Sequence, residues 1–169
     1  MQDARAAELH PVTSPPCLDA ARDAGESQVV DVIDGDTVRL MDGREVRLVG
    51  TQAPKLPLGR DGYPTWPLAH EARAALMDMV LRETVKLRIG GLEIDRHGRT
   101  LAPLVVASGA HAGQWVQGTM IGSGLARVYT FSDNRACAAE LIALELGARD
   151  ERHGIWANKF YRIRLPNEL

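Results

Sequence analysis

The chain has 169 residues, which is the size of one ordinary domain and leaves no room for two. Its hydrophobic content of 45% and charged content of 25% are typical of globular proteins and exclude a wholly disordered, collagen-like or disulfide-dense chain. The chain has 20 basic and 22 acidic residues, so its formal charge is −2. Any phosphate-binding site must therefore be built locally rather than from an overall positive field.

Residues 1–27 are expected to form an extended arm, because they contain three prolines and few large apolar side chains. No basic segment followed by an apolar one indicates a signal peptide, and no uncharged run is apolar enough to cross a membrane. Cys17 lies in the arm and Cys137 far along the chain, so we expect one long-range disulfide, with two unpaired thiols as the alternative. A disulfide implies an exported or periplasmic protein, and free thiols imply a cytoplasmic one.

Strand patterns begin after the arm. Alternating or β-branched runs predict strands over residues 28–33, 36–41, 44–49, 85–89 and 100–106, with a candidate last strand over 125–131. The dipeptide Asp42-Gly43 between two of these runs predicts a tight hairpin. Residues 52–67 contain four prolines and two glycines and predict a long loop, a feature that is usually either functional or disordered.

Helical spacing of apolar residues predicts an amphipathic helix over 68–82 and a short helix over 115–121. Asp133 or Asn134 is expected to cap a third helix that runs to about Arg149. Five short strands interleaved with three helices predict an α+β fold, in which a five-stranded OB-like β-barrel carries the helices. The barrel domain is expected over residues 28–158, followed by a C-terminal tail over 159–169.

Three segments carry candidate chemistry: Val-Ile-Asp-Gly-Asp-Thr over 32–37, Arg-Leu-Val-Gly-Thr-Gln-Ala-Pro-Lys over 47–55, and Asp-Arg-His-Gly-Arg-Thr-Leu-Ala over 95–102. Each segment alone is most often a turn or a solvated hairpin tip. Together and in this order, followed by Gly-Leu-Ala-Arg-Val over 124–128 and Gly-Ile-Trp over 154–156, they resemble the staphylococcal-nuclease-like (thermonuclease) family. Such proteins are OB-fold barrels that cleave DNA and RNA phosphodiesters with one Ca²⁺.

The resemblance implies a metal-binding role for Asp36 and a phosphate clamp made of Arg47 and Arg99, supported by the carboxylates of Asp34 and Asp95. An arginine pair suits this role, because a guanidinium stays charged and binds phosphate oxygens bidentately. In-line attack of water on a phosphodiester further needs a hard cation and a carboxylate that accepts the proton of the water.

The chain departs from the family pattern in the second segment, where the relatives typically read Arg-Leu-x-Gly-x-Asp-Ala/Thr-Pro-Glu. The second metal aspartate is replaced by Gln52, which offers only a neutral oxygen, and the water-activating glutamate by Lys55, whose ammonium cannot accept a proton. Ca²⁺ binding at Asp36 and Gln52 is therefore predicted to be weak or absent. Lys55 adds a third phosphate-binding cation. We expect the domain to bind DNA, RNA or a small phosphate ester, with Ca²⁺-dependent hydrolysis impaired or lost.

Two alternatives stay open. An active metal-dependent endonuclease requires a rebuilt site, for which a replacement base or ligand is available in the set Asp61, His70, Glu71 and His97. A protein-interaction module would use exposed aromatic residues, for which the candidates are Trp66, Trp115, Tyr129, Phe131 and Tyr161. Of these, Tyr129 and Phe131 lie near the positions where the family places tyrosines beside the bound nucleotide, and we expect them to stack on a base.

Overall fold

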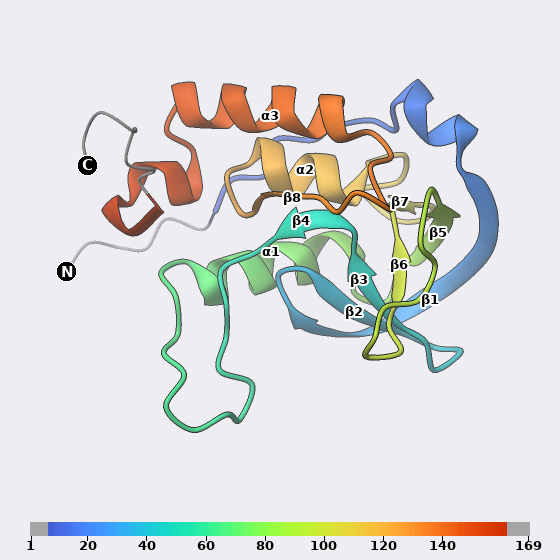
Figure 1. Cartoon of the computed structure of the whole chain (residues 1–169), viewed down its shortest axis with the longest axis horizontal. Helices are drawn as coiled ribbons and strands as arrows, with labels where there is room; N and C mark the ends of the chain where they lie inside the picture. The colour runs from blue at the N-terminus through green and yellow to red at the C-terminus, as the bar shows by residue number, and fades with distance from the viewer. Residues whose placement is uncertain (1–6, 162–169) are drawn as a thin grey trace.

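A computed structural model describes residues 7–161 of the chain and contains a curved sheet with helices packed against it (Figure 1). The strands are β1 (Arg22–Asp34), β2 (Thr37–Leu40), β3 (Glu45–Leu48), β4 (Gly50–Gln52), β5 (Thr84–Ile89), β6 (Thr100–Ala102), β7 (Leu104–Val106) and β8 (Arg127–Tyr129). The α-helices are α1 (Ala69–Val80), α2 (Val116–Gly122) and α3 (Ala138–Asp150). Short 3₁₀ helices are η1 (Pro16–Ala20), η2 (Gly154–Ala157) and η3 (Lys159–Tyr161).

The long strand β1 organises the main sheet, whose six strands have the order β6-β3-β2-β1-β5-β7. Its first half pairs with β5 and its second half with β2, and register shifts mark irregularities along both ladders. The two edge strands β6 and β7 are separated in the chain by Pro103 alone, and they pair with β3 and β5 respectively. The predicted α+β, OB-like architecture is confirmed. The sheet is not closed into the expected five-stranded barrel, since β6 and β7 are its two edges and β4 pairs separately with β8.

The core lies between the inner face of the sheet and the buried faces of the helices. The predicted amphipathic helix is α1, which buries Ala72, Leu76 and Met79 completely. At the turn before β2, a Cβ on Gly35 would lie 2.6 Å from the Cβ of Ala53. A glycine is therefore needed there for the turn to approach the segment that follows β4.

The N-terminal segment differs from the expected arm. The predicted strand start at residue 28 is wrong, because β1 begins six residues earlier and its polar first half pairs with β5. Residues 7–21 cross the helical layer as a strap: the backbone N–H of Val12 donates to Thr119 Oγ1 (3.0 Å), and the N–H of Trp115 donates to the Val12 carbonyl (2.7 Å). The side chain of Leu18 is buried in the core. The strap is thus packed along its length.

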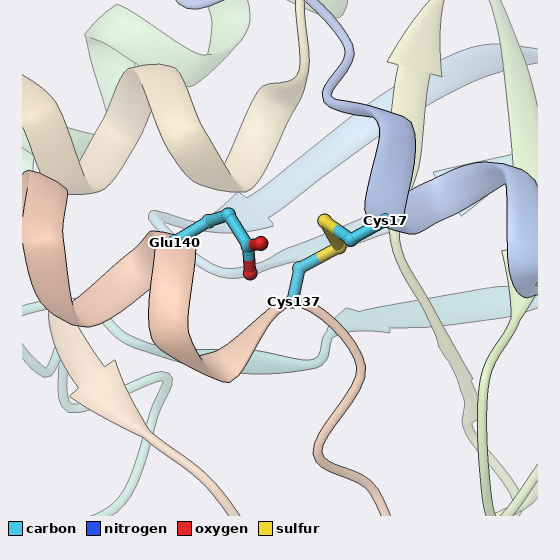
Figure 2. A group of neighbouring side chains, drawn as sticks. All are labelled: Cys17, Cys137 and Glu140. Carbon is cyan, nitrogen blue, oxygen red and sulfur yellow. A yellow bond between two sulfur atoms is a disulfide. The ribbon is translucent and has the colours of Figure 1, made fainter.

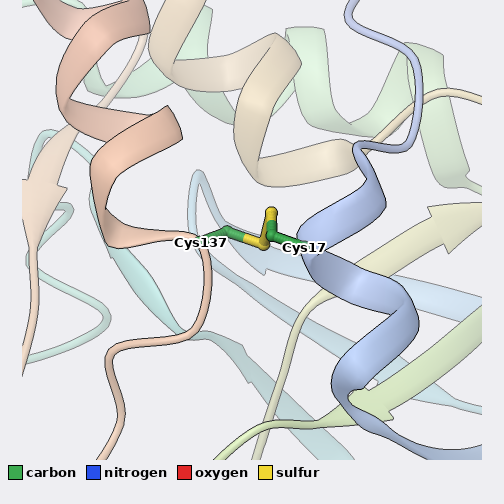
Figure 3. Close-up of a disulfide and its surroundings, with 2 residues drawn as sticks. All are labelled: Cys17 and Cys137. Carbon is green, nitrogen blue, oxygen red and sulfur yellow. A yellow bond between two sulfur atoms is a disulfide. The ribbon is translucent and has the colours of Figure 1, made fainter.

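A disulfide joins Cys17 to Cys137, with the carboxylate of Glu140 beside it (Figure 2). The bond links η1 to the residue that precedes α3, so two segments 120 residues apart in the sequence are fixed together (Figure 3). Among residues 7–161, no helix combines the length and apolarity that crossing a bilayer requires.

The predicted helix cap at Asp133 or Asn134 is wrong, since α3 starts after Cys137. Asn134 is instead buried, and its Nδ2 donates to the carbonyl of Leu92 at 2.9 Å. Residues 159–161 of the predicted tail form η3, in which Tyr161 is buried, and residues 162–169 lie outside the described part of the chain.

Candidate functional site

A pocket of about 980 Å³ opens between the turn after β1, the strands β3 and β4, the loop that follows β4, the 92–101 hairpin and the end of β8. Every residue that the sequence motifs assigned to the site lines this pocket: Asp36, Arg47, Gln52, Lys55, Arg99, Tyr129 and Phe131. The lining holds five acidic and five Lys or Arg side chains, so its charge is balanced overall and unevenly distributed.

Two carboxylates meet at the turn between β1 and β2. Oδ1 of Asp34 accepts the backbone N–H of Asp36 (3.0 Å), and Oδ2 of Asp36 accepts the backbone N–H of Ala53 (2.9 Å). Burial raises the pKa of Asp34 to about 7, and the neighbouring charge of Asp36 adds to this shift. The turn therefore holds two acids whose negative charges repel each other. Both carboxylate oxygens of Asp36 already accept protein hydrogen bonds, Oδ2 from Ala53 and Oδ1 from the Thr37 hydroxyl (3.2 Å).

Arg47 lies on β3 with its guanidinium largely buried and tied to the backbone. Its Nη1 lies 3.3 Å from Oδ2 of Asp36 and donates to the Leu48 carbonyl (3.1 Å), while Nη2 donates to the Thr51 carbonyl (2.6 Å). Among the described residues, Nε of Arg47 meets no acceptor. Arg47 is thus a rigidly oriented cation that is paired with a carboxylate and keeps part of its donor capacity for a ligand.

Arg99 is held by the hairpin that carries it. Its Nε donates to Oδ2 of Asp95 (2.8 Å), and its backbone N–H donates to Oδ1 of the same carboxylate (3.0 Å). Burial acts to raise the pKa of Asp95, but hydrogen bonds from the backbone of Arg99 and His97 outweigh it and lower the pKa below its ordinary value. Within residues 7–161 the terminal nitrogens of Arg99 donate to no protein acceptor, so they can bind a phosphate bidentately.

Gln52 is paired with a residue that the sequence reasoning did not select. It lies on β4 directly opposite Arg127 of β8, and its Oε1 accepts hydrogen bonds from Nε (2.8 Å) and Nη2 (2.6 Å) of that arginine. Arg127 belongs to the segment over 124–128 that contributes to the family resemblance, so the sequence does contain a signal for it. Only the pairing of β4 with β8 shows that Arg127 lies beside Gln52.

Lys55 and Trp66 close the base of the long loop that projects from the body of the molecule (Figure 1). The backbone N–H of Trp66 donates to the Lys55 carbonyl (2.9 Å), and Nζ of Lys55 lies 5.3 Å from the centroid of the Trp66 ring. The guanidinium of Arg127 lies 5.9 Å from the same ring. Phe160 and Tyr161 of η3 pack against this indole, with ring centroids 5.4 Å and 6.3 Å away.

The residues of the two alternative hypotheses are only partly brought together. His97 lines the pocket, whereas Asp61, His70 and Glu71 are not part of its wall. The exposed rings of Tyr129 and Phe131 contact each other edge to face at 5.1 Å on the pocket wall. Trp115 is buried in the core and offers no surface to a partner.

The residues present fit Ca²⁺ poorly. Among residues 7–161, the one group of three side chains with metal-ligand spacing is Cys17, Cys137 and Glu140, in which both sulfurs belong to the disulfide (Figure 2). In the pocket, Oε1 of Gln52 is taken by Arg127, and the ammonium of Lys55 repels a divalent ion. Ca²⁺ prefers six to eight oxygen ligands, so two partly engaged carboxylates are a weak donor set.

Comparison with known proteins agrees with the motif order. The family model described as staphylococcal nuclease homologue matches residues 45–158. A protein named ParB from Escherichia coli is 34% identical over 138 residues, covering 78% of this chain and 72% of its own length. An uncharacterized endonuclease of Escherichia coli O157:H7 (28% identical, 78% and 76% covered) and a thermonuclease of Staphylococcus hyicus (26% identical, 78% and 75% covered) are also similar. The chain therefore belongs to the staphylococcal nuclease homologue family.

Proposed function

We propose that this protein binds phosphodiester groups of nucleic acid in the described pocket and that its Ca²⁺-dependent hydrolysis is impaired or lost. The observation that carries the proposal is the pairing of Gln52 with Arg127, because the neutral amide oxygen at the position of the family's metal-binding carboxylate already accepts two hydrogen bonds from a guanidinium. Lys55 on the pocket wall supports it, since an ammonium cannot take a proton from water.

Binding and cleavage depend on different groups, so one can be retained without the other. The terminal nitrogens of Arg99 and Nε of Arg47 are available for phosphate oxygens, and the exposed rings of Tyr129 and Phe131 are available for a base. Hydrolysis also needs a proton acceptor for the attacking water, and the loss of a general base typically reduces the rate by about 10²–10⁴.

The test is a cleavage assay on plasmid DNA and on RNA with Ca²⁺, Mg²⁺, Mn²⁺ or chelator. Four proteins are compared: wild type, the double variant Gln52→Asp with Lys55→Glu, the variant Arg47→Ala, and the control Lys86→Glu on the exposed side of β5. We expect near-background cleavage by wild type and control, and a Ca²⁺-dependent gain in the double variant. Strong metal-dependent turnover by purified wild type that Arg47→Ala abolishes refutes the proposal.

The second candidate is an active endonuclease with a rebuilt site. It is favoured by His97, which lies on the pocket wall, and by similar proteins that carry the names endonuclease and thermonuclease. This candidate predicts that wild type cleaves nucleic acid and that His97→Ala reduces the rate by about 10² or more without weakening oligonucleotide binding. For either candidate function, the Cys17–Cys137 disulfide supports the proposal that the protein acts in an oxidising compartment.

A further inference from the structure

The two arginines of the family pattern, Arg47 and Arg99, are not the cations that lack a carboxylate partner at the pocket. Arg47 is paired with Asp36 and Arg99 with Asp95, at 3.3 Å and 2.8 Å. Within the described part of the chain, neither Lys55 nor Arg127 forms an ion pair with a carboxylate. Arg60 and Arg96 on the pocket wall also form no ion pair with a carboxylate among residues 7–161, so uncompensated positive charge lies there as well as at Lys55 and Arg127. What distinguishes Lys55 and Arg127 is that they lie at the same tryptophan, Trp66.

These two cations are held against one aromatic ring. Nζ of Lys55 and the guanidinium of Arg127 lie 5.3 Å and 5.9 Å from the centroid of Trp66. The rings of Phe160 and Tyr161 in η3 pack against the indole, and the backbone N–H of Trp66 donates to the Lys55 carbonyl. These contacts hold the ring in place. Cation–π attraction to the indole orients both charges. Lys55 is exposed and Arg127 is partly buried, so both remain accessible to an anion.

Gln52 fixes Arg127 without neutralising it. The amide oxygen accepts two N–H groups of the guanidinium, which leaves Nη1 with no acceptor among residues 7–161 and leaves the full positive charge. A carboxylate at this position would orient the arginine equally well and cancel its charge. The same substitution that weakens the metal site thus provides an uncompensated cation beside the pocket.

We propose that Lys55 and Arg127, supported by Trp66 and Gln52, form a second phosphate subsite that works without a divalent cation and binds a neighbouring phosphate of the same nucleic-acid strand. The inference rests on the proposed function, which supplies the first phosphate position at Arg47 and Arg99. Lysine contributes a mobile point charge and arginine a planar fork, a combination that suits a phosphodiester of variable geometry.

The experiment measures the binding of fluorescein-labelled octathymidylate by anisotropy, in chelator, over a series of salt concentrations. Lys55→Gln and Arg127→Met are compared with Lys86→Gln and Arg39→Met, exposed residues on β5 and β2 outside the pocket wall. Each subsite variant is expected to weaken binding about tenfold and to lower the slope of log K against log salt by about 0.7, the value for one phosphate contact on a single strand. Both controls are expected to match wild type, and 1 mM Ca²⁺ is expected not to tighten binding.

Trp66→Phe tests the support and keeps the fold, because phenylalanine retains an aromatic ring between the loop and η3. We expect it to weaken binding less than Arg127→Met. If wild type and Arg47→Ala differ in affinity while Lys55→Gln and Arg127→Met behave like their controls, the second subsite is refuted and the proposed function stands. If wild type does not bind the oligonucleotide at all, the proposed function itself is refuted. Loss of binding in the subsite variants with unchanged binding in Arg47→Ala and Arg99→Ala refutes the first phosphate position and with it the proposed arrangement of two neighbouring phosphates.

Discussion

Removal of the Cys17–Cys137 disulfide is expected to cost a large part of the stability of the fold. The bond closes a segment with a sequence separation of 120 residues. The loop-entropy model assigns about 5 kcal/mol to a loop of this length, and native disulfides typically contribute about 2–5 kcal/mol when they are removed. We expect a decrease of about 3–5 kcal/mol in the free energy of unfolding, because the strap also keeps the hydrogen bonds from its backbone to the hydroxyls of Thr119 in α2 and of Ser123, which follows α2.

The assay is urea denaturation followed by tryptophan fluorescence, with oxidised wild type, reduced wild type and the double variant Cys17→Ala with Cys137→Ala. Reduced wild type keeps both sulfur atoms, so it isolates the crosslink from the packing of the side chains. It is expected to unfold at nearly the same urea concentration as the double variant, and reductant is expected to leave the variant unchanged. The reasoning is refuted if reduced and oxidised wild type unfold at the same urea concentration.

The same bond also supports one wall of the pocket. Cys137 follows a short segment that includes Phe131 and Asp133, which line the pocket. The carbonyl of Asp133 accepts the backbone N–H of Leu92 at 3.0 Å, so the segment is anchored at both ends. Reduction is therefore expected to weaken oligonucleotide binding in addition to lowering stability, and hydrogen exchange over 131–136 would register the loosening.

Two further changes have defined outcomes. Because the pKa of Asp34 is raised to about 7 from 3.8, the folded state retains a proton that the unfolded chain has lost, and the free energy of unfolding decreases as pH rises from about 4 to 7. Asp34→Asn should remove this slope in urea denaturation at several pH values, and an unchanged slope would contradict the assignment. Gly124→Ala should destabilise the fold by more than about 2 kcal/mol, since φ is +68° and the new Cβ would lie 2.1 Å from the His153 carbonyl oxygen. Gly122→Ala, with no atom nearer than 3.6 Å and ordinary φ, is the matched control for thermal denaturation.

The sequence predicted the parts of the fold that local patterns determine. The apolar alternation of 36–41 and 44–49 predicts β2 and β3, and the helical spacing of 68–82 predicts α1 within two residues at each end. Its motifs also identified a set of residues that do meet in one pocket, because the turn after β1, the segment from β3 to the loop after β4, and the 92–101 hairpin all contribute to its wall.

Contacts between distant segments produced the errors. The first half of β1 is polar and lacks alternation, so its strand conformation depends on the ladder with β5, more than 50 residues away in the chain. Asn134 has the side chain of a helix cap, but its amide is used by the carbonyl of Leu92, and α3 begins only after Cys137. In both cases a non-local hydrogen bond outweighs a local preference.

Non-local contacts also determine the effective charge of each cation in the site, which the sequence alone does not show. The motifs identify Arg47, Lys55 and Arg99 as cations of the pocket, but the phosphate affinity of each depends on whether a carboxylate already neutralises it. Arg47 and Arg99 each hold a partner acid, so a phosphate must share these guanidinium groups with Asp36 and Asp95. In the proposed subsite, Lys55 and Arg127 would add attraction that neither Asp36 nor Asp95 reduces. A ligand would gain from both pairs of cations only if it carries at least two phosphates. If the proposed subsite is correct, we expect the protein to bind a strand of nucleic acid more tightly than a small phosphate ester, and competition between octathymidylate and inorganic phosphate would measure this preference directly.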